Sequence, residues 1–255
     1  MSDVRLRFAS FNIRTPVVTD LGNYWPKRKA FVAETIRDVL KPDVIGLQEC
    51  DFDQATYLAG ELPEYEWAGV GRSDGREKGE MVPIFHRRDR VERLDVCHFW
   101  LSETPEVAGS KSWLTSLPRM VTWARFRVEA REFCFFNAHF DHVSPMARKN
   151  GASLLRSRVD DVAPVPCVVA GDFNAAPGKP PYVNLIAGGG LIDHAPADAE
   201  GTFHGFSGKP GSRIDWLLTT PHWQDVTYAA DRTVNDDGRY PSDHFPILID
   251  ATLPA

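Results

Sequence analysis

Short apolar runs that end in polar residues recur along the whole chain. Val4, Leu6 and Phe8 alternate with polar residues, which is typical of a strand with one buried face. The run over residues 43–49 is nearly all apolar, which indicates a strand buried on both faces. With turn residues as boundaries, we predict strands over residues 4–12, 43–49, 65–70, 81–86, 91–101, 119–128, 132–139, 167–170, 213–218, 226–230 and 245–251.

Helical spacing of apolar residues appears in fewer places. Pro26 suits the first turn of a helix, and the apolar positions that follow it recur at helical spacing until Pro42. Ser144 and Pro145 start another helix with an apolar face. We predict helices over residues 26–40, 53–62, 144–162 and 181–186. Many strands with few helices indicate an α/β (α+β) fold of two packed sheets with helices outside.

Composition narrows the class of protein. With 255 residues, 43% of them hydrophobic, the chain can bury a large core, and we expect a single domain over residues 1–255. A net charge of −6 argues against binding nucleic acid through a broad basic surface, although a nuclease that reaches its substrate through metal ions is not excluded. The four widely spaced cysteines are predicted to be buried thiols. Because no signal segment or membrane span is apparent, we expect a cytoplasmic protein without membrane contact.

The stretch around Asp172 is the strongest local signal of chemistry. An apolar run ends at Gly171, and an acid and an amide follow two positions apart, at Asp172 and Asn174. If the strand continues, both side chains point to one face while Phe173 turns into the core. The alternative is a polar turn, because Asp and Asn also favour turns.

Residues fit for metal or proton chemistry stand at other strand ends as well. Any one of them could be a turn residue, but active sites are often built where sheet strands end. The set comprises Asn12, Glu49, His139, Asp172, Asn174, Asp215, Asp243 and His244.

The order of these short motifs resembles the endonuclease/exonuclease/phosphatase superfamily. The matching blocks are Ser10-Phe11-Asn12, Leu47-Gln48-Glu49, Asn137-Ala138-His139-Phe140-Asp141, Gly171-Asp172-Phe173-Asn174, Arg213-Ile214-Asp215 and Ser242-Asp243-His244. The resemblance implies a four-layer α/β/β/α sandwich of two packed mixed sheets flanked by helices. It also implies a metal-dependent hydrolase of phosphoesters, which uses Mg²⁺ or possibly Mn²⁺.

The resemblance assigns a role to each matched position. Glu49 corresponds to the main metal ligand, with Asn12 and Asp243 as nearby metal-site residues. His244 corresponds to the catalytic histidine, and Asp215 to the carboxylate that fixes its tautomer. Oxygen ligands of this kind suit magnesium.

The remaining matched positions surround the phosphate. Asp172 corresponds to the residue that orients the attacking water, and either Asp172 or His244 is the base. Asn174 resembles a donor to the transition-state phosphate, and His139 a contact to the phosphate or the leaving group. Arg119 resembles a phosphate-binding arginine. Asp141 and His142 are either partners of this site or turn residues.

The substrate is a separate question from the superfamily. The chain resembles a compact bacterial branch that has only the catalytic domain, and this branch acts on small phosphorylated compounds such as sugar phosphates. We therefore expect a small phosphorylated substrate, with a DNA or RNA nuclease as the alternative and a non-catalytic binding protein as a third, unfavoured one. The charged segment over residues 71–80 is predicted to be a mobile surface loop, or a rim over the pocket. The sequence leaves the oligomeric state open.

Overall fold

The computed structural model describes residues 2–255. Its strands are β1 (Val4–Asn12), β2 (Val44–Gln48), β3 (Tyr65–Ala68), β4 (Ile84–Arg87), β5 (Glu92–Trp100), β6 (Met120–Val128), β7 (Arg131–His139), β8 (Cys167–Asp172), β9 (Ile192–Asp193), β10 (Asp215–Thr219), β11 (Gln224–Ala230) and β12 (Ile247–Leu253). Its α-helices are α1 (Trp25–Glu34), α2 (Phe52–Glu61), α3 (Pro145–Asp161) and α4 (Pro180–Ile186). Shorter helical turns cover Val18–Asn23, Thr35–Leu40 and Ala187–Gly189.

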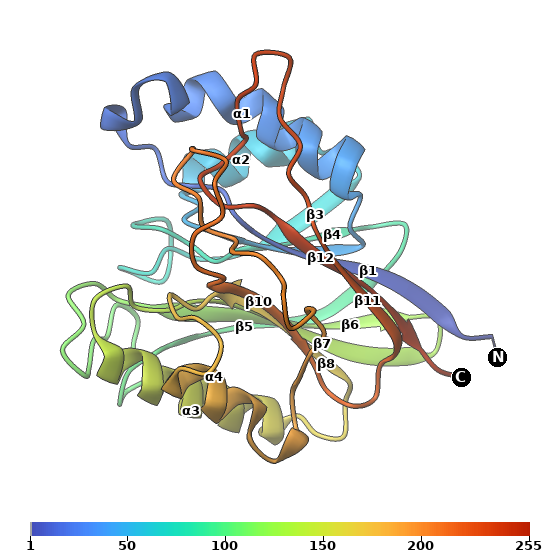
Figure 1. Cartoon of the computed structure of the whole chain (residues 1–255). Coiled ribbons are helices and arrows are strands. Elements are labelled where there is room, and N and C mark those ends of the chain that lie inside the picture. Colours follow the sequence, from blue (N-terminus) through green and yellow to red (C-terminus); the bar gives the residue numbers. More distant parts are fainter. Residues whose placement is uncertain (1) are drawn as a thin grey trace.

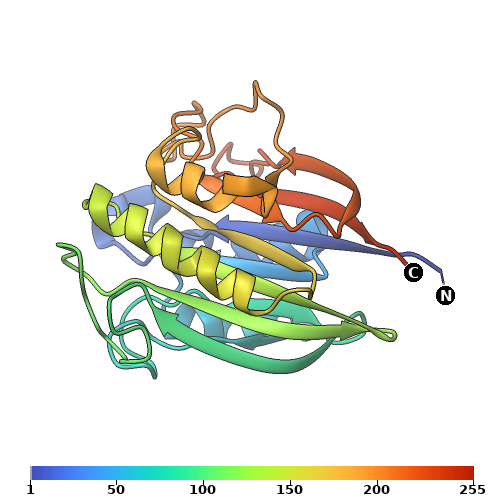
Figure 2. The same cartoon turned by 90° about the horizontal axis from the view of Figure 1, so that it is seen from below.

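The strands form two six-stranded sheets, in the orders β11-β12-β1-β2-β4-β3 and β5-β6-β7-β8-β10-β9. Both sheets are mixed, since β1 pairs in parallel with β2 but antiparallel with β12, and β7 pairs in parallel with β8 but antiparallel with β6. Helices α1 and α2 cover the first sheet, and α3 and α4 cover the second (Figure 1). The view from below shows α3 lying across the strands of its sheet (Figure 2). The predicted four-layer α/β/β/α sandwich is confirmed.

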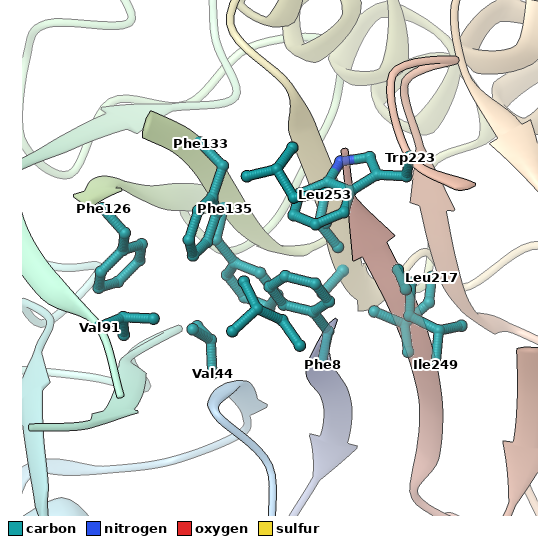
Figure 3. Packing of buried hydrophobic residues seen from close by; sticks show 14 of the residues in the cluster. Phe8, Val44, Val91, Phe126, Phe133, Phe135, Leu217, Trp223, Ile249 and Leu253 are labelled. Carbon is teal, nitrogen blue, oxygen red and sulfur yellow. The ribbon is translucent and has the colours of Figure 1, made fainter. Parts of the chain in front are cut away.

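Three large apolar clusters hold the layers together. The central one lies between the sheets, where the ring of Phe8 packs edge-on against Phe133 and Trp223 at centroid distances of 5.6 and 5.1 Å (Figure 3). The other two clusters lie between each sheet and its helices. Burial of apolar surface at about 25 cal/mol per Å² is the main driving force for such packing.

Most predicted elements are confirmed, with shifts of up to three residues at their ends. The helix predicted over residues 26–40 is α1 followed by a π-helical turn, which ends where Lys41 takes a left-handed φ of 47° before Pro42. The turn Val18–Asn23 and the short strand β9 were not predicted. Cys50, Cys134 and Cys167 are buried free thiols as expected, whereas Cys97 is partly exposed.

The segment over residues 71–80, predicted as a mobile surface loop or a rim over the pocket, is closed by its own hydrogen bonds. Its two arms are joined by backbone hydrogen bonds from Arg72 to Glu80 and from Ser73 to Lys78, both 3.0 Å long. The Arg72 and Glu80 side chains form an ion pair of 2.7 Å, and Arg72 is only 9% exposed. The segment is therefore a tied hairpin-like turn, and its end at Glu80 reaches the cavity described below.

Within residues 2–255, no helix combines the length and the apolar character that crossing a bilayer requires.

Candidate functional site

Strand register brings the predicted site residues to one end of the sandwich. In the second sheet His139 pairs with Asp172, and Asp172 pairs with Asp215 on the neighbouring strand. In the first sheet Asn12 pairs with Gln48, directly before Glu49. The carboxyl ends of the parallel pairs therefore face each other across the two sheets.

A buried asparagine fixes the distance between the sheets near this end. The amide of Asn137, on β7, donates to the carbonyl oxygens of Leu47 and Pro83 at 2.8 and 2.9 Å. Its oxygen accepts from Gln48 Nε2 at 2.6 Å. A Cβ on Gly46 would lie 2.5 Å from the Asn137 side chain, so glycine is needed there for the close approach. This contact sets Glu49 opposite His139.

A cavity of about 430 Å³ opens at these strand ends. Seven of the nine predicted site residues line it, and Asn12 and Asp215 lie behind the wall and contact lining residues. The lining residues are Arg14, Thr15, Glu49, Glu80, Leu117, Arg119, His139, His142, Asp172, Asn174, Phe203, Ser212, Ile214, Asp243 and His244.

His244 and Asp215 form a buried pair. Asp215 Oδ2 lies 2.9 Å from His244 Nδ1, and both residues are less than 5% exposed. Thr202 supports the pair, since its hydroxyl accepts from the backbone N–H groups of Ile214 and Asp215 at 3.1 Å. Burial opposes a charged imidazole, but Asp215 and Asp172 outweigh it and raise the pKa of His244. Nδ1 is thus tied to Asp215, and Nε2 faces the cavity side, 3.9 Å from Asp172 Oδ2.

Asp172 lies at the centre of the site. Its Oδ2 accepts from Asn12 Nδ2 at 3.0 Å and lies 3.6 Å from His139 Nε2. Burial, with the nearby Asp215 charge, raises its pKa above the usual range of an aspartate. Of the strand and the turn that the sequence offers for Asn174, the structure has the turn. Strand β8 ends at Asp172, and Asn174 takes a left-handed φ of 48°. A turn closed by the Asn174 N–H donating to Asp172 Oδ1 at 2.9 Å brings its side chain to the cavity. Phe173 is fully buried, as predicted.

The acidic side of the cavity fits a divalent metal ion. A carboxylate oxygen of Glu49 and one of Asp172 lie within 4.8 Å of each other and of a ring nitrogen of His139. Asp243 lies beside them, where Arg14 approaches Glu49 at 3.7 Å and Asp243 at 3.8 Å. Burial, together with the charge of Glu49, raises the pKa of Asp243 against the opposing effect of His244. A crowded set of carboxylate oxygens is the donor set that Mg²⁺ or Mn²⁺ prefers.

Asn12 adopts a specific orientation toward this acidic side. Its Nδ2 donates to Glu49 Oε1 at 3.2 Å and to Asp172, and its Oδ1 accepts from the Arg14 N–H at 3.0 Å. In this orientation the amide holds two carboxylates by hydrogen bonds. Its role as a metal-site residue stays a prediction.

Arg119 holds the opposite side of the cavity. It is 5% exposed, and its Nη1 and Nη2 lie 3.1 and 2.8 Å from Nδ1 of His139 and Nδ1 of His142. A guanidinium only donates, so both imidazoles accept at Nδ1 and carry their proton on Nε2. Burial, followed by the charge of Arg119, lowers the pKa of His139 well below its usual value, which keeps the ring neutral.

Sequence reasoning missed three residues that build the site. Glu80 lines the cavity, 3.8 Å from Arg119 Nη1, and Thr202 and Asn137 support the walls. Asn137 belongs to a matched motif block, and Glu80 ends the segment that the sequence offers as a rim over the pocket, but neither pattern assigns the residue a contact; no pattern singles out Thr202. Arg28 and His204 lie outside the lining: Arg28 donates to backbone carbonyls, and His204 stacks on Phe245 at 4.0 Å.

The site combines four chemical groups at the carboxyl ends of two packed sheets. It holds an oxygen-rich metal-binding corner, a central carboxylate, a histidine oriented by an aspartate, and an arginine on the far wall. These are the groups that hydrolysis of a phosphoester requires: neutralisation of charge, an oriented water and proton transfer. The fold and the site are those of a phosphoesterase, with an acidic side that fits a divalent metal ion.

Comparison with known proteins gives the family. Residues 9–244 match the model of the Endonuclease/Exonuclease/phosphatase family, and the chain belongs to that family. Members of this family are phosphoester hydrolases and generally depend on a divalent metal ion. The class of the protein is therefore that of a hydrolase acting on phosphoester bonds.

Three proteins similar to this chain differ in sequence identity and in how much of each chain the match covers. The structure of the Bacteroides thetaiotaomicron mannosyl-6-phosphatase is 33% identical, with a TM-score of 0.89, and covers 96% of this chain and 99% of its own. This near-equal length matches the compact branch expected from the sequence. Drosophila melanogaster Nocturnin is 24% identical, and the match spans 90% of this chain but 42% of that relative. D. rerio TDP2 in complex with a single-strand DNA product is 18% identical, covers 98% of this chain and 99% of its own, and has a TM-score of 0.77, which shows the fold alone.

Proposed function

We propose that this protein is a metal-dependent phosphatase for a small phosphorylated compound of the sugar-phosphate class. The charge of the cavity is the observation that carries the proposal. Four carboxylates line it, from Glu49, Glu80, Asp172 and Asp243, against the two guanidiniums of Arg14 and Arg119. Arg14 is itself paired with Asp20 at 3.1 Å, and no lysine of residues 2–255 lines the cavity, so the positive charge is confined to Arg119, His244 and a cation at the acidic side and does not extend along a groove for further phosphates.

A nucleic acid places different demands on such a site. Flanking phosphates of a polymer need Lys or Arg along the groove, because their neutralisation supplies most of the affinity. A single phosphate needs only the metal corner and one arginine. The similarity to a mannosyl-6-phosphatase over nearly the whole length supports the same substrate class. A nuclease remains the second candidate, since the fold is shared with a relative crystallised with DNA.

Each residue has a part in the proposed reaction. Glu49 and Asp243 would hold a divalent metal ion, which would supply positive charge to neutralise the phosphate. Asp172 orients the attacking water, and Asp172 or His244 accepts its proton, with Asp215 holding the imidazole. Arg119 neutralises the phosphate from the other side.

The test is phosphate release by the protein after removal of metal with a chelator, with and without added Mg²⁺. Substrates are mannose 6-phosphate and other sugar phosphates, nucleotides, inositol phosphates and oligonucleotides. Metal-dependent turnover of sugar phosphates is expected, and Asp172→Asn should lose at least about 100-fold in kcat. Asp198→Asn is the matched control, because Asp198 is exposed and lies outside the cavity. Cleavage of oligonucleotides without turnover of any sugar phosphate would overturn the proposal.

A further inference from the structure

His142 is a cavity residue to which neither the family resemblance nor the reaction above assigns a part. It follows His139 by three positions, in the segment directly after β7, and its side chain is solvent-accessible. Arg119 Nη2 holds its Nδ1 at 2.8 Å. Because the guanidinium can only donate, the proton of the neutral ring sits on Nε2, at the opposite edge of the imidazole. Among residues 2–255 no group accepts from that Nε2.

The backbone that carries His142 is rigidly tied. Asp141 is 2% exposed, and its Oδ1 accepts from the Val143 N–H at 2.8 Å and from the Ser144 N–H at 2.5 Å. Its second oxygen accepts from the hydroxyl of Thr115. A ring fixed at Nδ1 and at its backbone loses little freedom when a ligand binds to its free edge, which favours affinity. His142 is therefore a pre-organised donor rather than a loose surface side chain.

Glu80 supplies an acceptor on the same wall. Its Oε2 lies 3.8 Å from Arg119 Nη1, and Arg119 in turn holds His142 with Nη2. The carboxylate is paired with Arg72 at 2.7 and 2.9 Å, yet it lines the cavity and is 19% exposed. Each carboxylate oxygen has two lone pairs, so the pairing with Arg72 leaves room for a hydroxyl. Leu117, 39% exposed, adds an apolar surface to the same cavity.

We propose that His142 is a specificity-determining residue, whose Nε2–H donates to an oxygen of the leaving group while Glu80 accepts from one of its hydroxyls. An N–H donor and a carboxylate acceptor that both contact Arg119 match the hydroxyls of a polyol, which both give and receive hydrogen bonds. An apolar wall at Leu117 matches the C–H face of a sugar ring. The subsite thus selects a leaving group that is a sugar or polyol. This inference rests on the proposed phosphatase function and deepens it.

The carboxylate of Glu80 also explains what the subsite rejects. A planar leaving group with no hydroxyl besides the leaving oxygen, such as phenol, offers no ring hydroxyl to the His142 donor or to the Glu80 acceptor. Polar groups that lose water when the ligand binds and gain no partner reduce affinity and give strong discrimination.

The experiment compares kcat/KM for mannose 6-phosphate and for phenyl phosphate, measured with Mg²⁺ present. In the wild-type protein the sugar phosphate is preferred. In His142→Leu the ratio of the two kcat/KM values falls about tenfold, the loss expected for one hydrogen bond. His142→Gln, which keeps an N–H donor, recovers part of the ratio. Val143→Ala is the matched control. Val143 follows His142 directly in the sequence, its side chain is 60% exposed, and it does not line the cavity.

The possible outcomes separate this inference from the proposed function. If His142→Leu lowers kcat/KM for both substrates equally, or changes neither, the phosphatase function stands and the inference is wrong. If the wild-type protein hydrolyses neither compound but cuts oligonucleotides, both are overturned. A fall in the ratio with retained unfolding temperature supports the inference, because loss of fold would reduce both activities together.

Discussion

Substitution of Asn137 tests how the two sheets are held in register at the site. In Asn137→Ala three buried hydrogen bonds are lost, those to Leu47 O, to Pro83 O and from Gln48 Nε2. Each such bond contributes about 1 kcal/mol net, so the free energy of unfolding should fall by about 3 kcal/mol. For a chain of this size that corresponds to a drop in Tm of roughly 10 °C.

The assay is urea unfolding followed by tryptophan fluorescence, in chelator so that metal binding does not contribute to stability. Asn184→Ala is the matched control. Its amide donates to Ser153 Oγ at 2.9 Å and to Lys149 O at 3.3 Å on the surface between α3 and α4, and its loss should cost less than about 1 kcal/mol. If the free energy of unfolding falls equally in Asn137→Ala and Asn184→Ala, the hydrogen bonds of Asn137 do not stabilise the contact between the sheets.

Two further predictions concern histidines. Asp215→Asn should lower the pKa of His244, since the Asp215 charge raises it against burial, and should reduce kcat by about 100-fold with little change in KM; histidine NMR titration and steady-state kinetics check both. An unchanged His244 pKa would contradict the pairing. Burial lowers the pKa of His86 to about 4, so the unfolded chain takes up a proton below pH 6.5 while the folded chain does not. The contribution of the neutral His86 ring to the free energy of unfolding is fully present above pH 6.5 and is lost as the pH falls through 4. Between pH 7 and pH 5 the free energy of unfolding should therefore fall by about 2 kcal/mol less in His86→Gln than in the wild-type protein. Equal falls in the two proteins, measured by urea unfolding at each pH, would refute this.

Local patterns in the sequence were enough to predict the strands and long helices, because burial imposes a period on apolar residues. They also placed Asp172 and His139 at strand ends. In the structure, the pairing of β7 with β8 and of β8 with β10 puts His139, Asp172 and Asp215 side by side on adjacent strands. The resemblance to a family and its match over residues 9–244 rest on these same motifs.

Other features of the site depend on contacts between distant parts of the chain. Glu80 reaches the cavity only because the segment over residues 71–80 is closed by its own hydrogen bonds and the ion pair with Arg72. The tautomer of His142 is decided by Arg119, which is 23 positions away. Asn174 arrives through a left-handed turn and not through strand alternation.

The sequence by itself thus determined the elements, the sandwich and the chemical type of the site, since each depends on residue type and spacing. Tertiary structure decided which side chains contact each other, which imidazole nitrogen carries a proton, and how the charges of the cavity balance. The physical reason is that hydrogen-bond partners and electrostatic neighbours are set by distance in space, and Asn137 and Leu47, 90 positions apart, show how little that distance follows the order of residues.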